Sequence, residues 1–186
     1  MIVTLDTLFT KDLTSKVIIF PTDTVYGIGC LVNDIEAIHR IYQIKQRDYS
    51  KPLAILGASL EDIFPLVKDK TDVLTLGKKY WPGALTLVVK KSQKVCDLST
   101  SGQDTVGIRI PNHQVSMAIL EHFGPMVVTS LNLSSEPAIL KFEDVLKYEM
   151  FVDYIIDGGN LSSPASTVFD VINHKTLRQG DIIIKV

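Results

Sequence analysis

A short basic segment, residues 45–52, carries the most distinctive chemistry of the sequence. It places Lys45, Arg47 and Lys51 within seven residues, at the predicted end of a helix and before a predicted strand. Cations are also favoured at helix C-termini by the helix dipole, so a solvated helix cap is the alternative interpretation. However, a guanidinium flanked by ammonium groups, on a loop that Pro52 constrains, is what several adjacent phosphate charges require. The segment therefore predicts a site for a nucleoside triphosphate.

A further cation, Arg109, lies inside an apolar run, residues 105–110, that is predicted to form a strand. An unpaired charge in a half-buried strand is very costly, so Arg109 requires an anionic partner. That partner is either an acidic side chain of the protein or a carboxylate or phosphate of a substrate. His113, which follows this run, is interpreted as the start of a helix rather than as a catalytic base.

Loops rich in hydroxyl and amide side chains lie next to several other predicted strands. Taken singly, each is ordinary turn chemistry, because Ser, Asn, Gly and Pro dominate turns. In open α/β sheets, however, ligands bind outside strand ends, where such loops present donors to one cleft. Gly27 and Gly29 lack the spacing of a dinucleotide fingerprint, and the sequence has no P-loop. The loops are residues 21–29, 129–137, 163–167 and 177–180.

Length and composition limit the class of protein. At 186 residues, 46% of them hydrophobic, the chain is expected to form a single domain, residues 1–186. No apolar run approaches the roughly 20 residues of a membrane span, and residues 1–10 do not look like a secretory signal, which predicts a cytoplasmic protein without a membrane partner. Cys30 and Cys96 lie far apart and outside any metal-ligand spacing, which predicts reduced thiols and no metal ligands.

The elements that must position these residues alternate along the chain. Amphipathic stretches predict helices, of which the clearest begins behind Asn33 as N-cap and ends at Lys45. The strands are too many and too unevenly spaced for a pure βαβ series, and residues 173–176 form a hairpin-like turn. We therefore expect an α/β fold with a twisted, mixed parallel and antiparallel sheet flanked by helices. The other predicted helices are residues 60–68, 72–80, 114–123 and 142–150, and the predicted strands are residues 17–20, 53–56, 85–89, 105–110, 126–129, 154–156, 167–171 and 182–186.

Seven segments in chain order resemble the YrdC-like family, the bacterial threonylcarbamoyl-AMP synthases. No single motif is diagnostic, but seven in family order, from about Pro21 to Gly180, are hard to obtain by chance. They read PTDTVYGIG, KQRDYSKPL, YWPGALTLV, TVGIRIPNH, TSLNLSSEPA, PASTVFD and LRQG. The resemblance implies a YrdC-like fold and a nucleotidyltransferase that forms threonylcarbamoyl-AMP and pyrophosphate from L-threonine, bicarbonate and ATP. Partner proteins would then transfer the threonylcarbamoyl group to an adenosine of tRNA.

The same resemblance implies roles for individual residues. Lys45 and Arg47 would offset charge at the reacting phosphate, and Arg109 would bind the carboxylate of threonine in a bidentate manner. Mg²⁺ is expected with ATP, and no organic cofactor is expected. The residues implied for ATP are Arg47, Lys51, Thr105, Ser130, Asn132 and Arg178, and those implied for L-threonine are Thr24, Arg109 and Ser166.

The sequence departs from the family pattern at three positions. Leu131 stands where the family usually has Ala, and Ser135 stands where it usually has Gly, so the loop of residues 130–137 is expected to be bulkier and to narrow the site. Leu56 occupies a position where longer relatives often carry His. The chain is also expected to lack the extra C-terminal domain of those relatives, so its own loops or a partner would close the cleft.

Two other functions remain as alternatives. The first is an RNA-binding module, in which lysines would extend the basic surface around Arg47; they are Lys78, Lys79, Lys90, Lys91 and Lys94. The net charge of −2 and the lack of aromatic-rich RNA motifs count against it. The second is a paralogue with the same nucleotide site and another acyl acceptor.

Overall fold

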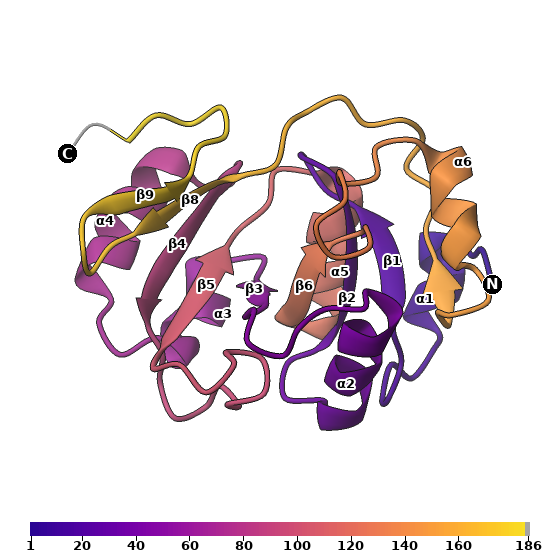
Figure 1. Cartoon of the computed structure of the whole chain (residues 1–186), viewed down its shortest axis with the longest axis horizontal. Coiled ribbons are helices and arrows are strands. Elements are labelled where there is room, and N and C mark those ends of the chain that lie inside the picture. Colours follow the sequence, from indigo (N-terminus) through magenta and orange to yellow (C-terminus); the bar gives the residue numbers. More distant parts are fainter. Residues whose placement is uncertain (185–186) are drawn as a thin grey trace.

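Residues 1–184, which the computed structural model describes, form one nine-stranded mixed sheet with helices on both sides (Figure 1). The strand order is β7-β1-β2-β6-β3-β5-β4-β8-β9. The predicted α/β fold with a mixed sheet is therefore confirmed. The strands are β1 (Ile18–Pro21), β2 (Tyr26–Leu31), β3 (Ala54–Leu56), β4 (Leu85–Lys90), β5 (Thr105–Arg109), β6 (Met126–Ser130), β7 (Tyr154–Ile155), β8 (Thr167–Asp170) and β9 (Lys175–Arg178).

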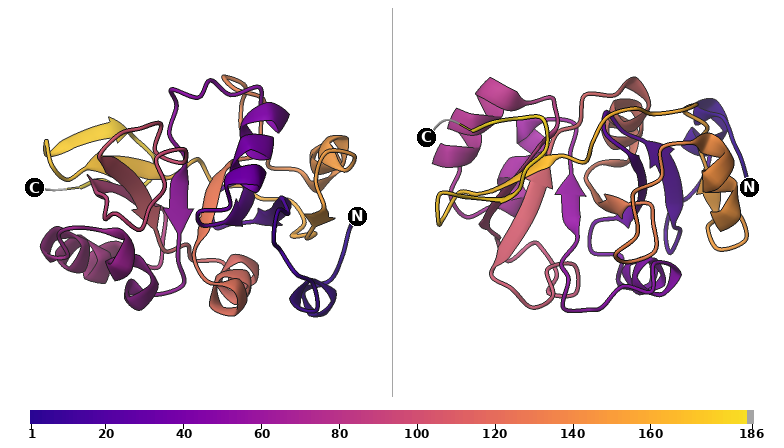
Figure 2. Two further views of the ribbon diagram at one scale, coloured as in Figure 1. Left: turned by 90° about the horizontal axis from the view of Figure 1, so that it is seen from below. Right: turned by 45° about the horizontal axis from the view of Figure 1, so that its top comes forward.

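Parallel and antiparallel pairs alternate irregularly along the sheet. Strand β1 pairs with β2, β2 with β6, β3 with β6, β4 with β5 and β8 with β9 in antiparallel fashion. The pairs β1 with β7, β3 with β5 and β4 with β8 are parallel. Figure 2 shows that the sheet twists along this order. The short β3 joins the two halves of the sheet at its centre.

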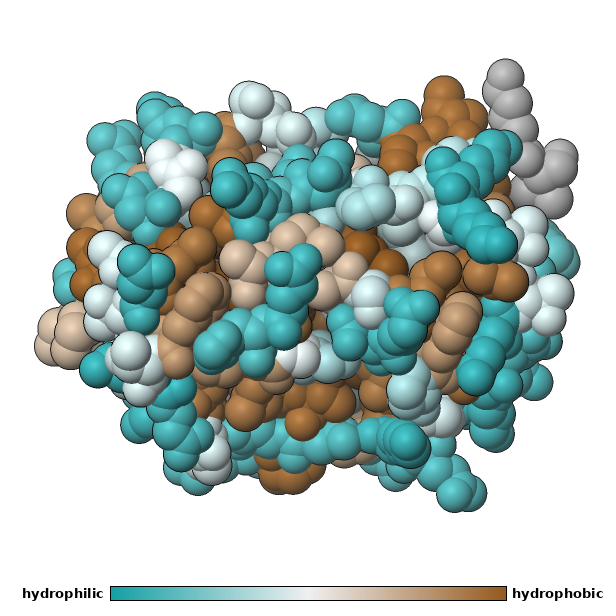
Figure 3. Space-filling view, turned by 180° about the vertical axis from the view of Figure 1, so that it is seen from behind, coloured by the Kyte–Doolittle hydropathy of each residue, from teal (hydrophilic) through white to brown (hydrophobic). Residues whose placement is uncertain are grey.

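Six α-helices and two 3₁₀ turns pack against this sheet within residues 1–184. None of these helices has the length and apolar character needed to cross a membrane. On the face opposite to that of Figure 1, hydrophobic side chains are interspersed with hydrophilic ones (Figure 3). The helices are α1 (Leu5–Phe9), α2 (Ile35–Ile44), α3 (Leu60–Ile63), α4 (Thr71–Tyr80), α5 (Gln114–Phe123) and α6 (Phe142–Val145), and the 3₁₀ turns are η1 (Phe64–Leu66) and η2 (Leu146–Tyr148).

The two faces of the sheet bury separate apolar clusters. Because side chains alternate along a strand, Ile18 and Phe20 of β1 pack with α1 and α5, whereas Val17 and Ile19 belong to the cluster that also contains α2, α3 and α4. The first face is covered by α1 and α5 over β1, β2 and β6. Leu56 of β3 is the link between this covered part and the cavity described below.

Strand β2 corrects the prediction of one continuous loop at residues 21–29. Only residues 22–25 turn, and the strand begins at Tyr26. Its glycines are needed for close packing rather than for a turn, because a Cβ at Gly29 would lie 2.7 Å from the carbonyl oxygen of Val127. A glycine-rich segment therefore forms a buried central strand.

Helix boundaries differ from the predictions in detail. The N-cap of α2 is Asp34, whose carboxylate accepts the N–H of Ala37, and not Asn33, which has a positive φ of 66°. The predicted C-terminal end of this helix at Lys45 is confirmed. The predicted helices at residues 60–68 and 142–150 are shorter, and each ends in a 3₁₀ turn. In the first, Pro65 lies in η1 and lacks the N–H that a longer helix needs.

The C-terminal part differs most from the prediction. No strand forms at residues 182–184, and residues 185–186 lie outside the described part of the chain. The last strand within the described part is instead β9, which forms the expected hairpin with β8. Residues 156–166 connect β7, at one edge of the sheet, to β8 near the other edge, and run along the top of Figure 1.

Candidate active site

A cavity of about 330 Å³ lies on the same sheet face as α1 and α5, over the part of that face that these helices leave uncovered. Alternate residues of neighbouring strands form its floor, because positions i and i+2 of a strand point to the same side. Gly107 of β5 pairs with Ala54 of β3 and with Val88 of β4, and all three line the cavity. A Cβ at Gly107 would lie 3.3 Å from Thr86 Cγ2, so glycine keeps this floor low.

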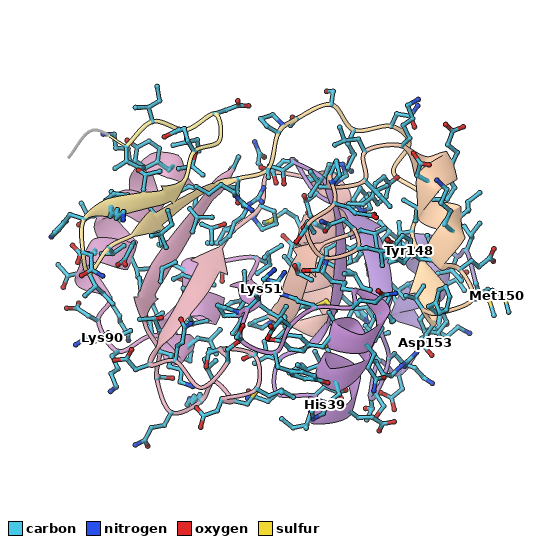
Figure 4. The ribbon with its side chains drawn as sticks, viewed as in Figure 1. His39, Lys51, Lys90, Tyr148, Met150 and Asp153 are labelled. Atoms are coloured by element: carbon cyan, nitrogen blue, oxygen red, sulfur yellow. The ribbon has the colours of Figure 1, made fainter. Side chains whose placement is uncertain are left out.

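Seven of the ten predicted site residues line the cavity. They come from three strands, β5, β6 and β9, and from three loops that lie far apart in the sequence. Lys45, Lys51 and Asn132 are not among the lining residues of the described chain. Lys51, labelled in Figure 4, lies on the loop between α2 and β3 in the middle of that view. The seven residues that line the cavity are Thr24, Arg47, Thr105, Arg109, Ser130, Ser166 and Arg178.

Arg47 uses part of its guanidinium to fasten its own loop. Its Nε donates to the carbonyl oxygen of Lys51 at 3.1 Å, and its Nη2 donates to that of Pro52 at 2.9 Å. Burial lowers the pKa of Arg47. By count, Arg47 keeps three of its five N–H donors for a ligand in the cavity, so the predicted phosphate contact has a rigid support.

Lys45 is a buried positioning residue in this structure. Its side chain is 1% exposed, and its Nζ donates to the carbonyl oxygens of Ser130 and Asn132 and to Asn132 Oδ1, the last at 2.8 Å. Burial, with a contribution from Arg47, lowers the pKa of Lys45 to about 7. All three ammonium donors are thus used by the protein. In this structure the Lys45 ammonium group therefore faces the loop after β6, and its expected role at the reacting phosphate stays a prediction.

The loop after β6 is held from inside. Ser130 Oγ donates to Asn132 Oδ1 at 2.8 Å, and Asn132 Nδ2 donates to the carbonyl oxygen of Glu136 at 2.6 Å. Leu131 is fully buried in the core and does not line the cavity. Contrary to the expectation, this larger residue does not narrow the site. Ser135, which stands where the family usually has Gly, has a positive φ of 75°.

Arg109 has a protein carboxylate as its partner. Its side chain is 6% exposed, and it donates from Nε to the Gly83 carbonyl oxygen at 3.0 Å, from Nη1 to Thr24 Oγ1 at 3.1 Å and from Nη2 to Asp23 Oδ1 at 2.5 Å. Burial lowers the pKa of Arg109, and the charge of Asp23 opposes this effect. The two partners considered from the sequence are therefore not exclusive, because Arg109 binds Asp23 and also lines the cavity.

A chain of hydroxyl groups fixes the orientation of Thr24. Thr22 Oγ1 donates its proton to the carbonyl oxygen of Val25 at 2.7 Å and lies 3.0 Å from Thr24 Oγ1. Because Thr22 has only one hydroxyl proton, Thr24 must be the donor in that second contact. The Thr24 oxygen, which already accepts from Arg109, is therefore left with only acceptor capacity for a ligand.

Ser166 and Arg178 form a second polar unit across the cavity. Arg178 donates from Nε to the carbonyl oxygen of Ser166 and from Nη2 to Ser166 Oγ, both at 2.9 Å. Ser166 Oγ also lies 2.9 Å from Thr86 Oγ1, and both residues are buried. Arg178, implied for ATP, therefore directly holds Ser166, implied for threonine.

Sequence reasoning missed three contributors to this site. Thr86 and Gln103 line the cavity, but Thr86 lies in an apolar strand and Gln103 in a polar segment without a motif. Asp23 is the third contributor and lies next to Thr24 in the sequence. The signal that could have identified it is Arg109, a predicted buried cation that requires an anion. His113 caps α5 as predicted, with its Nδ1 accepting the N–H of Val115 at 3.3 Å.

Protein ligands for a metal ion do not gather in this cavity. Within residues 1–184 there is no group of three or more His, Cys, Asp or Glu side chains that could hold a metal. The nearby carboxylate of Asp23 is paired with Arg109. Mg²⁺ commonly binds through substrate phosphates and water rather than in a cage of protein ligands. The expectation of Mg²⁺ with ATP stays a prediction.

The fold and the cavity define a class: α/β proteins with an arginine-lined cavity over the open face of a mixed sheet. A family model described as "Telomere recombination", Sua5_yciO_yrdC, matches residues 13–180. The chain belongs to this family, which confirms the predicted YrdC-like membership.

Comparisons with individual proteins agree. The chain is similar to the threonylcarbamoyl-AMP synthase of Pyrococcus abyssi, with 37% identity over 160 residues, which cover 84% of this chain and 47% of that protein. Its likeness to the Pseudoalteromonas translucida protein of the same name is 30% identity over 175 residues, 88% of this chain and 90% of that protein. A solved structure of P. abyssi Sua5 complexed with L-threonine is 32% identical, with a TM-score of 0.91 over 97% of this chain and 57% of the other. The chain thus spans about half the length of its longer relatives.

Proposed function

We propose that this protein is an L-threonylcarbamoyladenylate synthase. It would form threonylcarbamoyl-AMP and pyrophosphate from L-threonine, bicarbonate and ATP, and partner proteins would pass the product on for threonylcarbamoyladenosine modification of tRNA. The names of the relatives support this reaction, and one of them has nearly the same length as this chain. Free Cys30 and Cys96 fit a reducing cytoplasm, where we propose that the protein acts.

The observation that carries the proposal is the grouping of both predicted ligand sets around one cavity. Thr24, Arg109 and Ser166 line the same cavity as Arg47 and Arg178. A carboxylate anchored on Arg109 and a nucleotide held by Arg47 would therefore share one small space. Bringing two substrates together in this way is itself a large part of catalysis.

The reaction requires positioning and charge compensation rather than a protein nucleophile. The carboxylated amine of threonine would attack the α-phosphorus of Mg²⁺–ATP; a carbamate oxygen–phosphorus bond forms, the bond between the α-phosphorus and the bridging oxygen breaks, and pyrophosphate leaves. Arg47, on its fastened loop, would stabilise the charge that develops on the phosphates. Lys45 would act through Ser130 and Asn132, whose loop it holds.

A reconstitution with single amino acids tests the proposal. Purified protein is incubated with ATP, Mg²⁺, bicarbonate and one amino acid at a time, and pyrophosphate and the adenylate product are measured, the latter by mass spectrometry. We expect product only with threonine and bicarbonate present. Product with another amino acid would favour a paralogue with a different substrate. Tight RNA binding without pyrophosphate release would favour the RNA-binding module.

Two arginine variants test the assignment of the two ends of the cavity. Arg47→Ala should lower kcat/KM by roughly 10²-fold or more, because it removes a charge that stabilises the transition state. Arg109→Lys should mainly raise the KM for threonine, because one ammonium cannot reproduce the fork that holds several oxygens. Exposed Lys94→Ala is the control for the loss of a cation. Unchanged kinetics in both arginine variants would contradict this site.

A further inference from the structure

The guanidinium of Arg109 is mostly occupied in the protein alone. Of its five N–H donors, one binds Gly83, one binds Thr24 and one binds Asp23. By count, two donors remain for a ligand. A ligand carboxylate that binds these two donors would share the guanidinium of Arg109 with the carboxylate of Asp23.

Asp23 is thus a resident anion at the carboxylate-binding end of the cavity. Its side chain is 13% exposed and lies between Thr22 and Thr24, which both line the cavity. Asp23 does not itself line the cavity, but it is bound to the guanidinium that does. A ligand that carries only a carboxylate would therefore meet a like charge beside its anchor, which is unfavourable in a poorly solvated site.

A ligand that also carries a cation next to its carboxylate would not meet this repulsion. An α-ammonium group beside Arg109 could be accepted by Asp23 and by the oxygen of Thr24, which has only acceptor capacity left. The arrangement of one fixed cation and two acceptors is complementary to a zwitterion. It is not complementary to a simple carboxylate.

We infer that Asp23 is a specificity-determining residue that makes the cavity select α-amino acid zwitterions over carboxylates that lack the ammonium group. The inference rests on the proposed function, because it concerns the threonine end of the same cavity. A purely structural role, in which Asp23 only holds the Arg109 guanidinium in place, makes a different prediction. In that case loss of Asp23 weakens the binding of both kinds of ligand to the same extent.

Binding of two matched probes separates these roles. L-threonine is compared with 3-hydroxybutanoate, which keeps the carboxylate, hydroxyl and methyl groups and lacks the ammonium group. Isothermal titration gives the ratio of the two dissociation constants for the unaltered protein, Asp23→Asn and Asp23→Glu. We expect the unaltered protein to prefer threonine by at least about tenfold, Asp23→Asn by no more than about threefold, and Asp23→Glu by an intermediate factor.

The control is a second aspartate–arginine pair away from the cavity. Asp153, labelled in Figure 4, binds Arg40 at 2.8 Å, so Asp153→Asn also breaks an ion pair and should keep the original ratio. Asp23→Asn with the original ratio and a cooperative thermal transition would overturn the inference. If Asp23→Asn does not fold, an original ratio in Asp23→Glu does the same. If the unaltered protein binds ATP but not threonine, the proposed function fails as well, and the two failures are thereby distinguished.

Discussion

Single residues of the candidate site are held by protein oxygens before a ligand arrives. Arg47 fastens its own loop, Arg178 grips Ser166, and Lys45 binds the loop after β6 with all of its donors. Such preorganised cations do not need to be gathered or reoriented when charge develops on a substrate. The site thus contains cations with free donors for a ligand and one cation, Lys45, whose donors are all used by the protein.

Removal of the buried ammonium group should change how stability depends on pH. The pKa of Lys45 is about 7 in the folded protein, against an unfolded value of about 10.4. Between these values the unfolded chain binds a proton that the folded chain releases, so the free energy of unfolding gains from rising pH. The unaltered protein should therefore gain stability over Lys45→Met by up to about 1.4 kcal/mol per pH unit in this window.

Urea unfolding at pH 7, 8 and 9 measures this difference. Lys51→Met, which removes an exposed lysine from the same segment, controls for the loss of one charge. A difference between the unaltered protein and Lys45→Met that stays constant over these pH values would show that Lys45 keeps its proton on folding.

Residue types were more predictable than residue partners. The sequence identified Arg109 as a cation in need of an anion, and the structure provides Asp23. The sequence also suggested that Lys45 contacts phosphate. It could not show that the Lys45 ammonium group binds a loop 85 residues away, because tertiary structure sets the direction of a long side chain. The chemical character of a side chain follows from its residue type, whereas its orientation and its partners follow from the fold.

At the scale of elements, the loop after β6 contains a strained position. Ser135 has a positive φ of 75°, a conformation that glycine adopts at little cost. Ser135→Gly should raise the free energy of unfolding by about 0.5 to 1 kcal/mol, and the Tm by about 1 to 4 °C. Differential scanning calorimetry measures the change. Ser134→Gly, at a neighbouring position without a positive φ, should lower stability, and a loss of stability in Ser135→Gly would contradict the argument.

Strand β9 connects the two ends of the cavity through one side chain. Because Arg178 holds both the carbonyl oxygen and the hydroxyl of Ser166, Arg178→Ala should raise the KM for threonine as well as the KM for ATP, each by roughly tenfold. Steady-state kinetics with each substrate varied in turn tests this. Lys175→Ala, on the same exposed strand, is the control. A change confined to ATP would limit Arg178 to a nucleotide contact.

The elements that the sequence missed share a physical reason. Strand β2 contains two glycines and was interpreted as a loop, although the close approach of β6 is what requires them. Strand β9 is polar and fully exposed, so it lacks the hydrophobic pattern of a strand and is defined by its pairing with β8. Local pattern predicted the elements that bury apolar side chains, and tertiary pairing determined the others.

At the scale of the whole molecule, the cavity joins both halves of the sheet. Its lining comes from β2 and β6 on one side of β3 and from β5, β4, β8 and β9 on the other. A ligand should therefore stabilise the domain as one unit. At a threonine concentration of 100 times Kd the free energy of unfolding should rise by about 2.7 kcal/mol, and the Tm by about 5 to 10 °C. Calorimetry should show a single shifted transition; a second, unshifted one would contradict the argument.

The connection across residues 156–166 also makes this a divisible molecule. The hairpin of β8 and β9 carries Ser166 and Arg178, and it is attached to the rest through backbone pairing with β4 as well as through the covalent chain. A cut near Gly159, which is exposed and has a positive φ, would leave these interactions in place. Two fragments divided at this point would each carry part of the cavity, and the complete cavity would form only when the two associate.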